Sequence, residues 1–168
     1  LAQKFEGGVV YLNYAPSSDK SAGDSGVTDA GGSIMEIGLK ANVQGISINL
    51  GATDAKADTD ASTSEGEERS YAIGYSMGQF AVGAHKRTHD DGGTAAATND
   101  YENTSYGVTY AANDQISVGL QYGEASNGDD TVDEETTAFS VGYSLGGMGV
   151  ELTYSQTDNI GNVSGEDG

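Results

Sequence analysis

The chain of 168 residues offers few side chains that could perform catalysis. Its two histidines, His85 and His89, lie close together in one segment, and there is no cysteine to serve as a nucleophile or a thiolate ligand. No His-Glu-x-x-His motif or phosphate-binding loop is present. Glu36 and Glu151 could form an acid–base pair only if distant segments brought them together. We therefore expect a protein that is not an enzyme.

Acidic residues gather in two segments, 54–68 and 129–135. Ca²⁺ takes about six to eight oxygen ligands, many of them carboxylates. The second segment therefore contains a candidate calcium site made of Asp129, Asp130, Asp133 and Glu134. Neither segment has the spacing of an EF-hand, and a solvated acidic loop accounts for the same residues. Apart from this ion, the sequence indicates no cofactor.

The formal net charge of −19 argues against nucleic-acid binding, which needs a basic surface. No segment approaches the roughly 20 apolar residues of a transmembrane helix. Most of the 26 acidic residues fall in segments that we expect to be long loops. The exceptions, in expected strands or short turns, are Glu6, Glu36, Asp114 and Glu151.

A hairpin-like unit recurs four times along the chain, with expected turns near Gln44, Gly78, Asn113 and Gly146. The spacing is 33 to 35 residues, which indicates one supersecondary unit used repeatedly. Alternating apolar and small or polar residues on both sides of a short turn predict antiparallel hairpins. We expect nine strands and no helix, at 7–14, 33–41, 46–51, 71–77, 80–87, 105–110, 116–122, 138–144 and 148–155.

The two faces of these expected strands differ in an unusual way. One carries large apolar side chains, as in Ile73, Tyr75 and Met77, and the other carries Gly, Ser, Thr and Ala. This pattern predicts a β-barrel with lipid outside and a water-filled lumen inside. Strands of about 8 to 10 residues are long enough to cross a bilayer when tilted.

Several side chains have expected places in such a barrel. Charged residues on the small-residue face would line the pore and set its ion preference, namely Lys40, His85, Arg87, Glu36 and Glu151. For His85 and Arg87, a place on the solvated rim remains an equal alternative. Lys86 falls on the lipid-facing side, near enough to the strand end to reach the headgroups. Tyrosines on the bulky face would form membrane-interface girdles, namely Tyr71, Tyr75, Tyr106, Tyr110, Tyr122, Tyr143 and Tyr154.

Three stretches resemble the later strands of general diffusion porins of Gram-negative bacteria, especially the α-proteobacterial type. They are Ser-Tyr-Ala-Ile-Gly-Tyr-Ser-Met-Gly-Gln-Phe-Ala-Val-Gly-Ala at 70–84, Thr-Ser-Tyr-Gly-Val-Thr-Tyr at 104–110 with Gln-Ile-Ser-Val-Gly-Leu-Gln-Tyr at 115–122, and Ala-Phe-Ser-Val-Gly-Tyr-Ser-Leu-Gly-Gly-Met-Gly-Val-Glu-Leu-Thr-Tyr at 138–154. The resemblance covers nearly the whole chain. It implies an antiparallel up-and-down transmembrane β-barrel of 16 strands, a homotrimer, and passive diffusion of small hydrophilic solutes.

These observations together lead to one expectation and one alternative. We expect residues 1–168 to be an incomplete portion, about nine strands, of a single barrel domain in the bacterial outer membrane. The channel would pass small hydrophilic solutes and ions with a mild preference for cations, and its acidic loops would contact lipid and lipopolysaccharide. The alternative is a secreted or surface-exposed soluble β-protein, an adhesin or β-solenoid, with acidic, calcium-binding loops and with the bulky face buried as a core.

Overall fold

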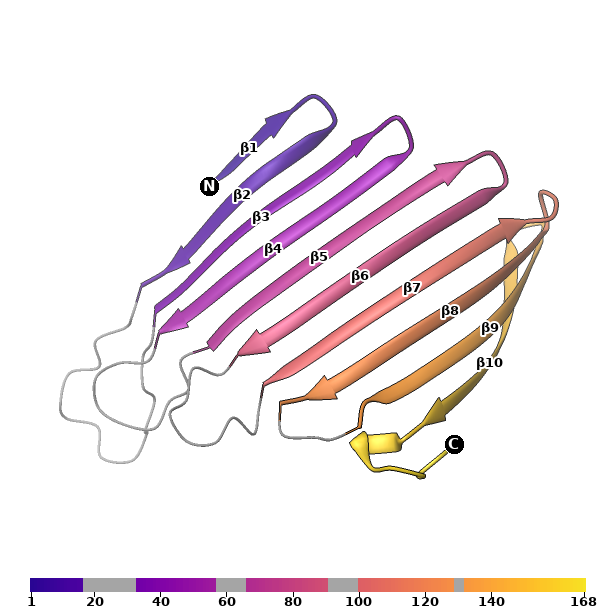
Figure 1. The fold of residues 1–168 in the computed structure, drawn as a ribbon. Helices are drawn as coiled ribbons and strands as arrows, with labels where there is room; N and C mark the ends of the chain where they lie inside the picture. Colours follow the sequence, from indigo (N-terminus) through magenta and orange to yellow (C-terminus); the bar gives the residue numbers. More distant parts are fainter. Residues whose placement is uncertain (17–32, 57–65, 91–99, 129–131) are drawn as a thin grey trace.

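A computed structural model of the chain shows one antiparallel sheet of ten strands, paired in chain order (Figure 1). It describes residues 1–16, 33–56, 66–90, 100–128 and 132–168. The strands are β1 Ala2–Phe5, β2 Gly8–Ala15, β3 Ser33–Val43, β4 Ile46–Lys56, β5 Gly66–Met77, β6 Phe80–Asp90, β7 Tyr101–Ala111, β8 Ile116–Asn127, β9 Glu134–Leu145 and β10 Met148–Asp158. A short 3-10 turn, η1 Ile160–Asn162, follows β10. None of the helical segments described is long and apolar enough to cross a membrane.

The short turns that join the strands lie where the sequence predicted them. Gln44 and Gly45 close β3–β4 with φ angles of 51° and 82°, and Gly78 closes β5–β6 with φ of 60°. The β7–β8 turn uses a side chain instead, because Asn113 Oδ1 accepts the backbone N–H groups of Gln115 and Ile116 at 2.8 and 2.9 Å. Left-handed backbone conformations and Asx turns are the local features that reverse a strand tightly.

The pairing register keeps each kind of side chain on its own face. Leu39 lies opposite Leu50, and Leu50 lies opposite Tyr71, whereas Gly51 on the other face lies opposite Ser70. We call these the bulky face and the small-residue face. No hydrophobic side chain of the described residues is buried, and Leu152 remains 74% exposed. The predicted alternation is confirmed, and this part of the chain has no core of its own.

Successive hairpins are displaced along the strands by a constant step. The pair Val43–Ile46 closes the β3–β4 hairpin, and its row continues through Tyr75, Leu120 and Phe139. These residues lie two, four and six positions from the turn ends of β5, β8 and β9. The displacement thus averages one residue per strand, six residues over the six steps from β3 to β9. If all turns lie at one height in the membrane, this displacement requires the strands to tilt away from the barrel axis. A rise of about 3.4 Å per residue and a strand spacing of about 4.8 Å give a tilt of about 35°, close to that of membrane barrels.

Two expectations from the sequence were wrong. The described residues form ten strands, not nine, because Ala2–Phe5 pairs with Gly8–Tyr11 across a turn at Gly7. The strands also extend further towards the long loops than their apolar residues do, since backbone pairing continues where the side chains are solvated. As a result, nine acidic residues expected in loops lie within strands, namely Asp54, Glu67, Glu68, Asp90, Glu102, Glu124, Glu134, Glu135 and Asp158.

Alanine substitutions at two turn glycines should separate backbone strain from steric conflict. A Cβ at Gly45 would lie 2.6 Å from the carbonyl oxygen of Ser76, whereas a Cβ at Gly78 would meet nothing within 4 Å. Both positions have positive φ, so we expect Gly78→Ala to lower the free energy of unfolding by about 1 kcal/mol. Gly45→Ala should lower it by about 2–3 kcal/mol, because the backbone of Ser76 must also move. Urea unfolding in lipid vesicles measures both losses, and equal losses would contradict this account of the turn.

Candidate functional site

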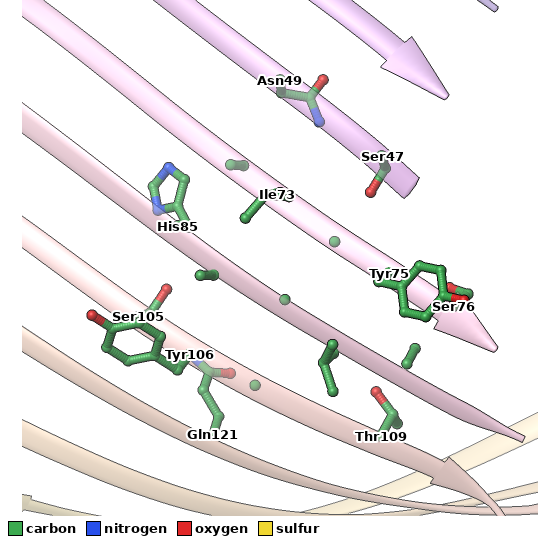
Figure 2. Close-up of a pocket in the computed structure, with 17 residues that line it drawn as sticks. Ser47, Asn49, Ile73, Tyr75, Ser76, His85, Ser105, Tyr106, Thr109 and Gln121 are labelled. Atoms are coloured by element: carbon green, nitrogen blue, oxygen red, sulfur yellow. The ribbon is translucent and has the colours of Figure 1, made fainter. Parts of the chain in front are cut away.

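The small-residue face contains a broad hollow that spans β4 to β8 (Figure 2). Its volume is about 510 Å³. Glycines on neighbouring strands form its floor, and the polar side chains around it are Ser47, Asn49, Ser76, His85, Ser105, Thr109 and Gln121. His85 lies opposite Ala72 and Ser105, so small neighbours leave its imidazole open to the hollow. The surface is polar, wide and without a bulky side chain on the small-residue face to block it.

Arg87 does not stand alone on this face. Its guanidinium donates two hydrogen bonds to Glu68, from Nε at 3.0 Å and from Nη2 at 2.7 Å. It also lies 5.5 Å from the centre of the Tyr101 ring, on which His89 stacks at 5.1 Å. Two parallel hydrogen bonds to a carboxylate fix the guanidinium in place. The four side chains therefore form a polar cluster at the loop end of β5, β6 and β7.

The other charged residues predicted on this face are there, but the structure does not bring them together. Lys40 lies opposite Asn49 and makes no ion pair with any described residue. Glu36 accepts a hydrogen bond of 3.1 Å from Asn13 Nδ2. Glu151, on the last strand, lies opposite Gly142 and lines a separate hollow of about 390 Å³ near the β7–β8 turn. The charges are thus spread over the whole width of the sheet.

The seven predicted interface tyrosines all lie on the bulky face, in two groups at different heights. Four lie at the middle of their strands or towards the long loops, namely Tyr71, Tyr106, Tyr122 and Tyr154, and three lie nearer the turns, namely Tyr75, Tyr110 and Tyr143. Apolar side chains such as Val108 and Leu120 lie between the groups. Most of these rings are exposed by 42% or more. Their assignment to the interfaces of a membrane stays a prediction.

Residues 2–162, nearly the whole chain, match the family model described as Gram-negative porin. The chain belongs to the Gram-negative porins. This family consists of channel proteins, not enzymes, and its members are located in the bacterial outer membrane. No curated protein and no solved structure matches the chain. The sheet described above is therefore the wall of a porin-type β-barrel.

The porin carries an acidic rim on its bulky face, beyond the tyrosines nearest the long loops. We give this name to Asp54, Glu67, Asp90, Glu102, Glu124, Glu135 and Asp158. Among the side chains that the structure describes, two cations pair with carboxylates of the rim. Arg69 pairs with Glu67 at 2.5 Å, and Lys86 pairs with Glu102 at 2.6 Å. All four side chains are about half exposed, so each pair contributes at most about 1 kcal/mol.

The predicted calcium site lies only partly in the described residues. Asp129 and Asp130 fall outside them. Asp133 accepts a hydrogen bond at its backbone carbonyl from Asn159, and the Glu134 carboxylate accepts the backbone N–H of Gly161 at 2.8 Å. Among the residues that the structure describes, no three His, Asp or Glu side chains are grouped to hold a metal ion.

The pattern Gly-x-Ser-x-Gly occurs twice in the porin, at 74–78 and 142–146. In hydrolases this pattern forms an elbow between a strand and a helix and exposes a nucleophilic serine. Here both copies run from the end of a strand into a hairpin turn, at β5–β6 and β9–β10. Ser76 and Ser144 are therefore wall residues, in agreement with the non-enzymatic family.

Several contributors to the small-residue face were missed from the sequence, among them Glu68, Lys4 and Tyr11. Glu68 was assigned to a loop, although its spacing from Ser70 and Ala72 continues the alternation of β5. Lys4 lies in the missed strand β1, on the same row as Lys40. Tyr11 covers Gly38, whose Cβ would lie 2.2 Å from the tyrosine ring. The alternation of β2 could have placed Tyr11, but nothing in the sequence indicates that its ring lies flat.

Arginine substitutions at neighbouring residues of β5 should distinguish the two faces of this porin. Ile73 is 56% exposed on the bulky face, and Ala72 lies beside it on the small-residue face. We expect Ile73→Arg to lower the free energy of unfolding in lipid by about 2–4 kcal/mol, because the charge would face hydrocarbon. Ala72→Arg should cost less than about 1 kcal/mol, since its side chain would reach water. Denaturant titration in vesicles gives both values, and the opposite order would reverse the assignment of the faces.

Proposed function

We propose that this porin, of the α-proteobacterial type, forms a water-filled channel for passive diffusion of small hydrophilic solutes and ions, with a mild preference for cations. The observation that carries the proposal is the separation of side chains between the faces of one continuous sheet. The small-residue face is hollow and polar, and the bulky face is apolar between two bands of tyrosine. A polar lumen and an apolar exterior are what a membrane channel of this architecture requires.

The proposed channel is a closed barrel of 16 strands that assembles as a homotrimer, as the family resemblance implies. Strands β1 and β10 are the edges of the described sheet. In hydrocarbon, each backbone polar group without a partner costs several kcal/mol, so open edges are not tolerated there. We therefore expect further strands to pair with both edges in the membrane.

The cation preference has its origin at the mouth and not in the wall. The charged side chains of the small-residue face are nearly balanced, with the cations Lys4, Lys40 and Arg87 against the anions Glu36, Glu68, Glu134 and Glu151. Most of the net charge of −19 must therefore lie elsewhere, chiefly in the segments expected to form the long loops. Such charge raises the local concentration of cations at the mouth of the pore.

Lipid and lipopolysaccharide are the proposed partners of the bulky face. The acidic rim lies just beyond the tyrosines, at the height where membrane headgroups begin. Its carboxylates lie directly opposite one another in pairs such as Asp54–Glu67 and Glu124–Glu135. Divalent ions such as Ca²⁺ would relieve this repulsion and bridge the rim to anionic lipopolysaccharide. Ca²⁺ would then be an ion shared between the carboxylates of the rim and lipopolysaccharide.

The soluble alternative is not favoured. It would require the bulky face to be buried as a core, but Ile73, Leu152 and Tyr154 are exposed by 56%, 74% and 69%. The family match also points to the outer membrane.

Neutralising adjacent cations on opposite faces of β6 should test the channel. Arg87 lies on the small-residue face and Lys86 on the bulky face, and each pairs with one glutamate. We expect Arg87→Gln to increase the preference for cations, because Glu68 is left without its partner in the lumen. Lys86→Gln removes the same charge from the exterior and should change the preference much less. The reversal potential in a salt gradient across a planar bilayer measures both effects.

Two outcomes of this experiment would count against the proposal. A complete, membrane-inserted protein without any single-channel conductance would exclude a channel. Equal shifts of the reversal potential for the two variants would show that the small-residue face does not line the conducting path.

A further inference from the structure

The chain folds back over the sheet after its last strand. It leaves β10 at Asp158, and η1 then contacts β9 and β8, the two strands that precede β10. Figure 1 shows η1 turned back beneath the ends of these strands. The segment returns at Gly168, which exchanges two backbone hydrogen bonds with Thr157 at 2.8 and 2.9 Å. Residues 159–167 thus form a loop, anchored at its base on β10, with its tip over neighbouring strands. We call it the mouth loop.

Asn162 holds the tip of the mouth loop. Its amide Nδ2 donates to the carbonyl oxygens of Ala125 at 2.9 Å and Val132 at 3.1 Å. Its Oδ1 accepts a hydrogen bond of 3.1 Å from Asn127 Nδ2. The residue has φ of 62°, a left-handed conformation that asparagine tolerates better than most residues. One side chain therefore joins the loop to β8 and to the connection between β8 and β9.

A second set of contacts holds the middle of the loop. Asn159 Nδ2 donates to the carbonyl oxygen of Asp133 at 3.1 Å, and its Oδ1 accepts the N–H of Gly165 at 3.2 Å. The backbone N–H of Gly161 donates to the Glu134 carboxylate at 2.8 Å. These contacts hold the middle of the loop against the start of β9.

The contacts also determine on which side of the sheet the loop lies. Asn127 lies opposite Tyr101, and Glu134 lies opposite Ala125, so both belong to the small-residue face. Their side chains reach the loop, and no residue of the acidic rim makes a described hydrogen bond with it through its side chain. The mouth loop therefore folds inward, over the end of the polar face, and not outward over the bulky face.

We infer that the mouth loop narrows the entrance of the channel above β8 and β9, with Asn162 as its latch. This inference rests on the proposed channel function. The loop brings Glu166 and Asp167 to the path of incoming solutes. It sets an upper limit on solute size and adds to the preference for cations. Asn162 acts by positioning the loop, without itself having to contact a solute.

Asn162→Gly in the full-length porin tests this role. Glycine accepts a positive φ, so the substitution removes three side-chain hydrogen bonds without straining the backbone. We expect the opened population of the loop to rise on the order of 10-fold to 100-fold. Protease nicking within 159–167 should therefore increase, single-channel conductance should rise, and sugars too large for the wild type should enter proteoliposomes. Asn42→Ala, which trims the same amide near the turn end of β3, outside the hollow and far from the loop, is the matched control and should leave the size limit unchanged.

Cross-linking provides a second, independent readout. Residues 1–168 contain no cysteine, so Asn127→Cys combined with Asn162→Cys introduces the only two thiols in this part of the porin. A short bifunctional thiol reagent should restore the conductance and the size limit of the wild type, and a cleavable reagent should allow this to be reversed. Increased nicking with unchanged conductance and size limit in every Asn162 variant would overturn the inference, because the loop would then lie outside the solute path. A wild type that conducts nothing would instead contradict the channel function itself.

Discussion

The backbone hydrogen-bond ladder is the interaction on which the rest of this structure depends. No hydrophobic side chain of the described residues is buried, so side-chain packing cannot fix how the strands align. The ladder does so through turns such as Gln44–Gly45 and Asn113, which set the pairing of each hairpin. Because side chains alternate with a period of two, a slip of one residue would exchange the faces. The same pairing register therefore determines which side chains face the lumen and which face the exterior.

The sequence predicted the elements that depend on local pattern. Alternation located the hairpins, and glycine or asparagine at Gly78 and Asn113 located the turns, because these signals act over a few residues. Strand β1 was missed because Ala2–Phe5 is too short to show an alternating pattern. It forms a strand because its backbone pairs with β2. The acidic ends of the strands were missed because the apolar alternation ends before the backbone pairing does.

Contacts between distant segments were beyond such reasoning. The partners of Asn162 lie 30 to 37 residues earlier in the chain, in a different hairpin. The ion pair of Arg87 with Glu68 spans 19 residues and requires the exact register of β5 and β6. The residues themselves carry no signal of these pairings. The candidate pore-lining positions could be predicted from alternation, but which charges are free to act on a solute could not.

The constant step between hairpins has a consequence for how such a protein can change size. Each unit of 33 to 35 residues adds two strands and the same displacement of one residue per strand. Duplication of a unit would widen the cylinder while preserving its inclination, its even number of strands and the level of its apolar band. Loss of a unit would do the reverse. A gene that encodes such a wall can therefore lengthen or shorten by whole hairpins, and each intermediate still matches the thickness of the same bilayer.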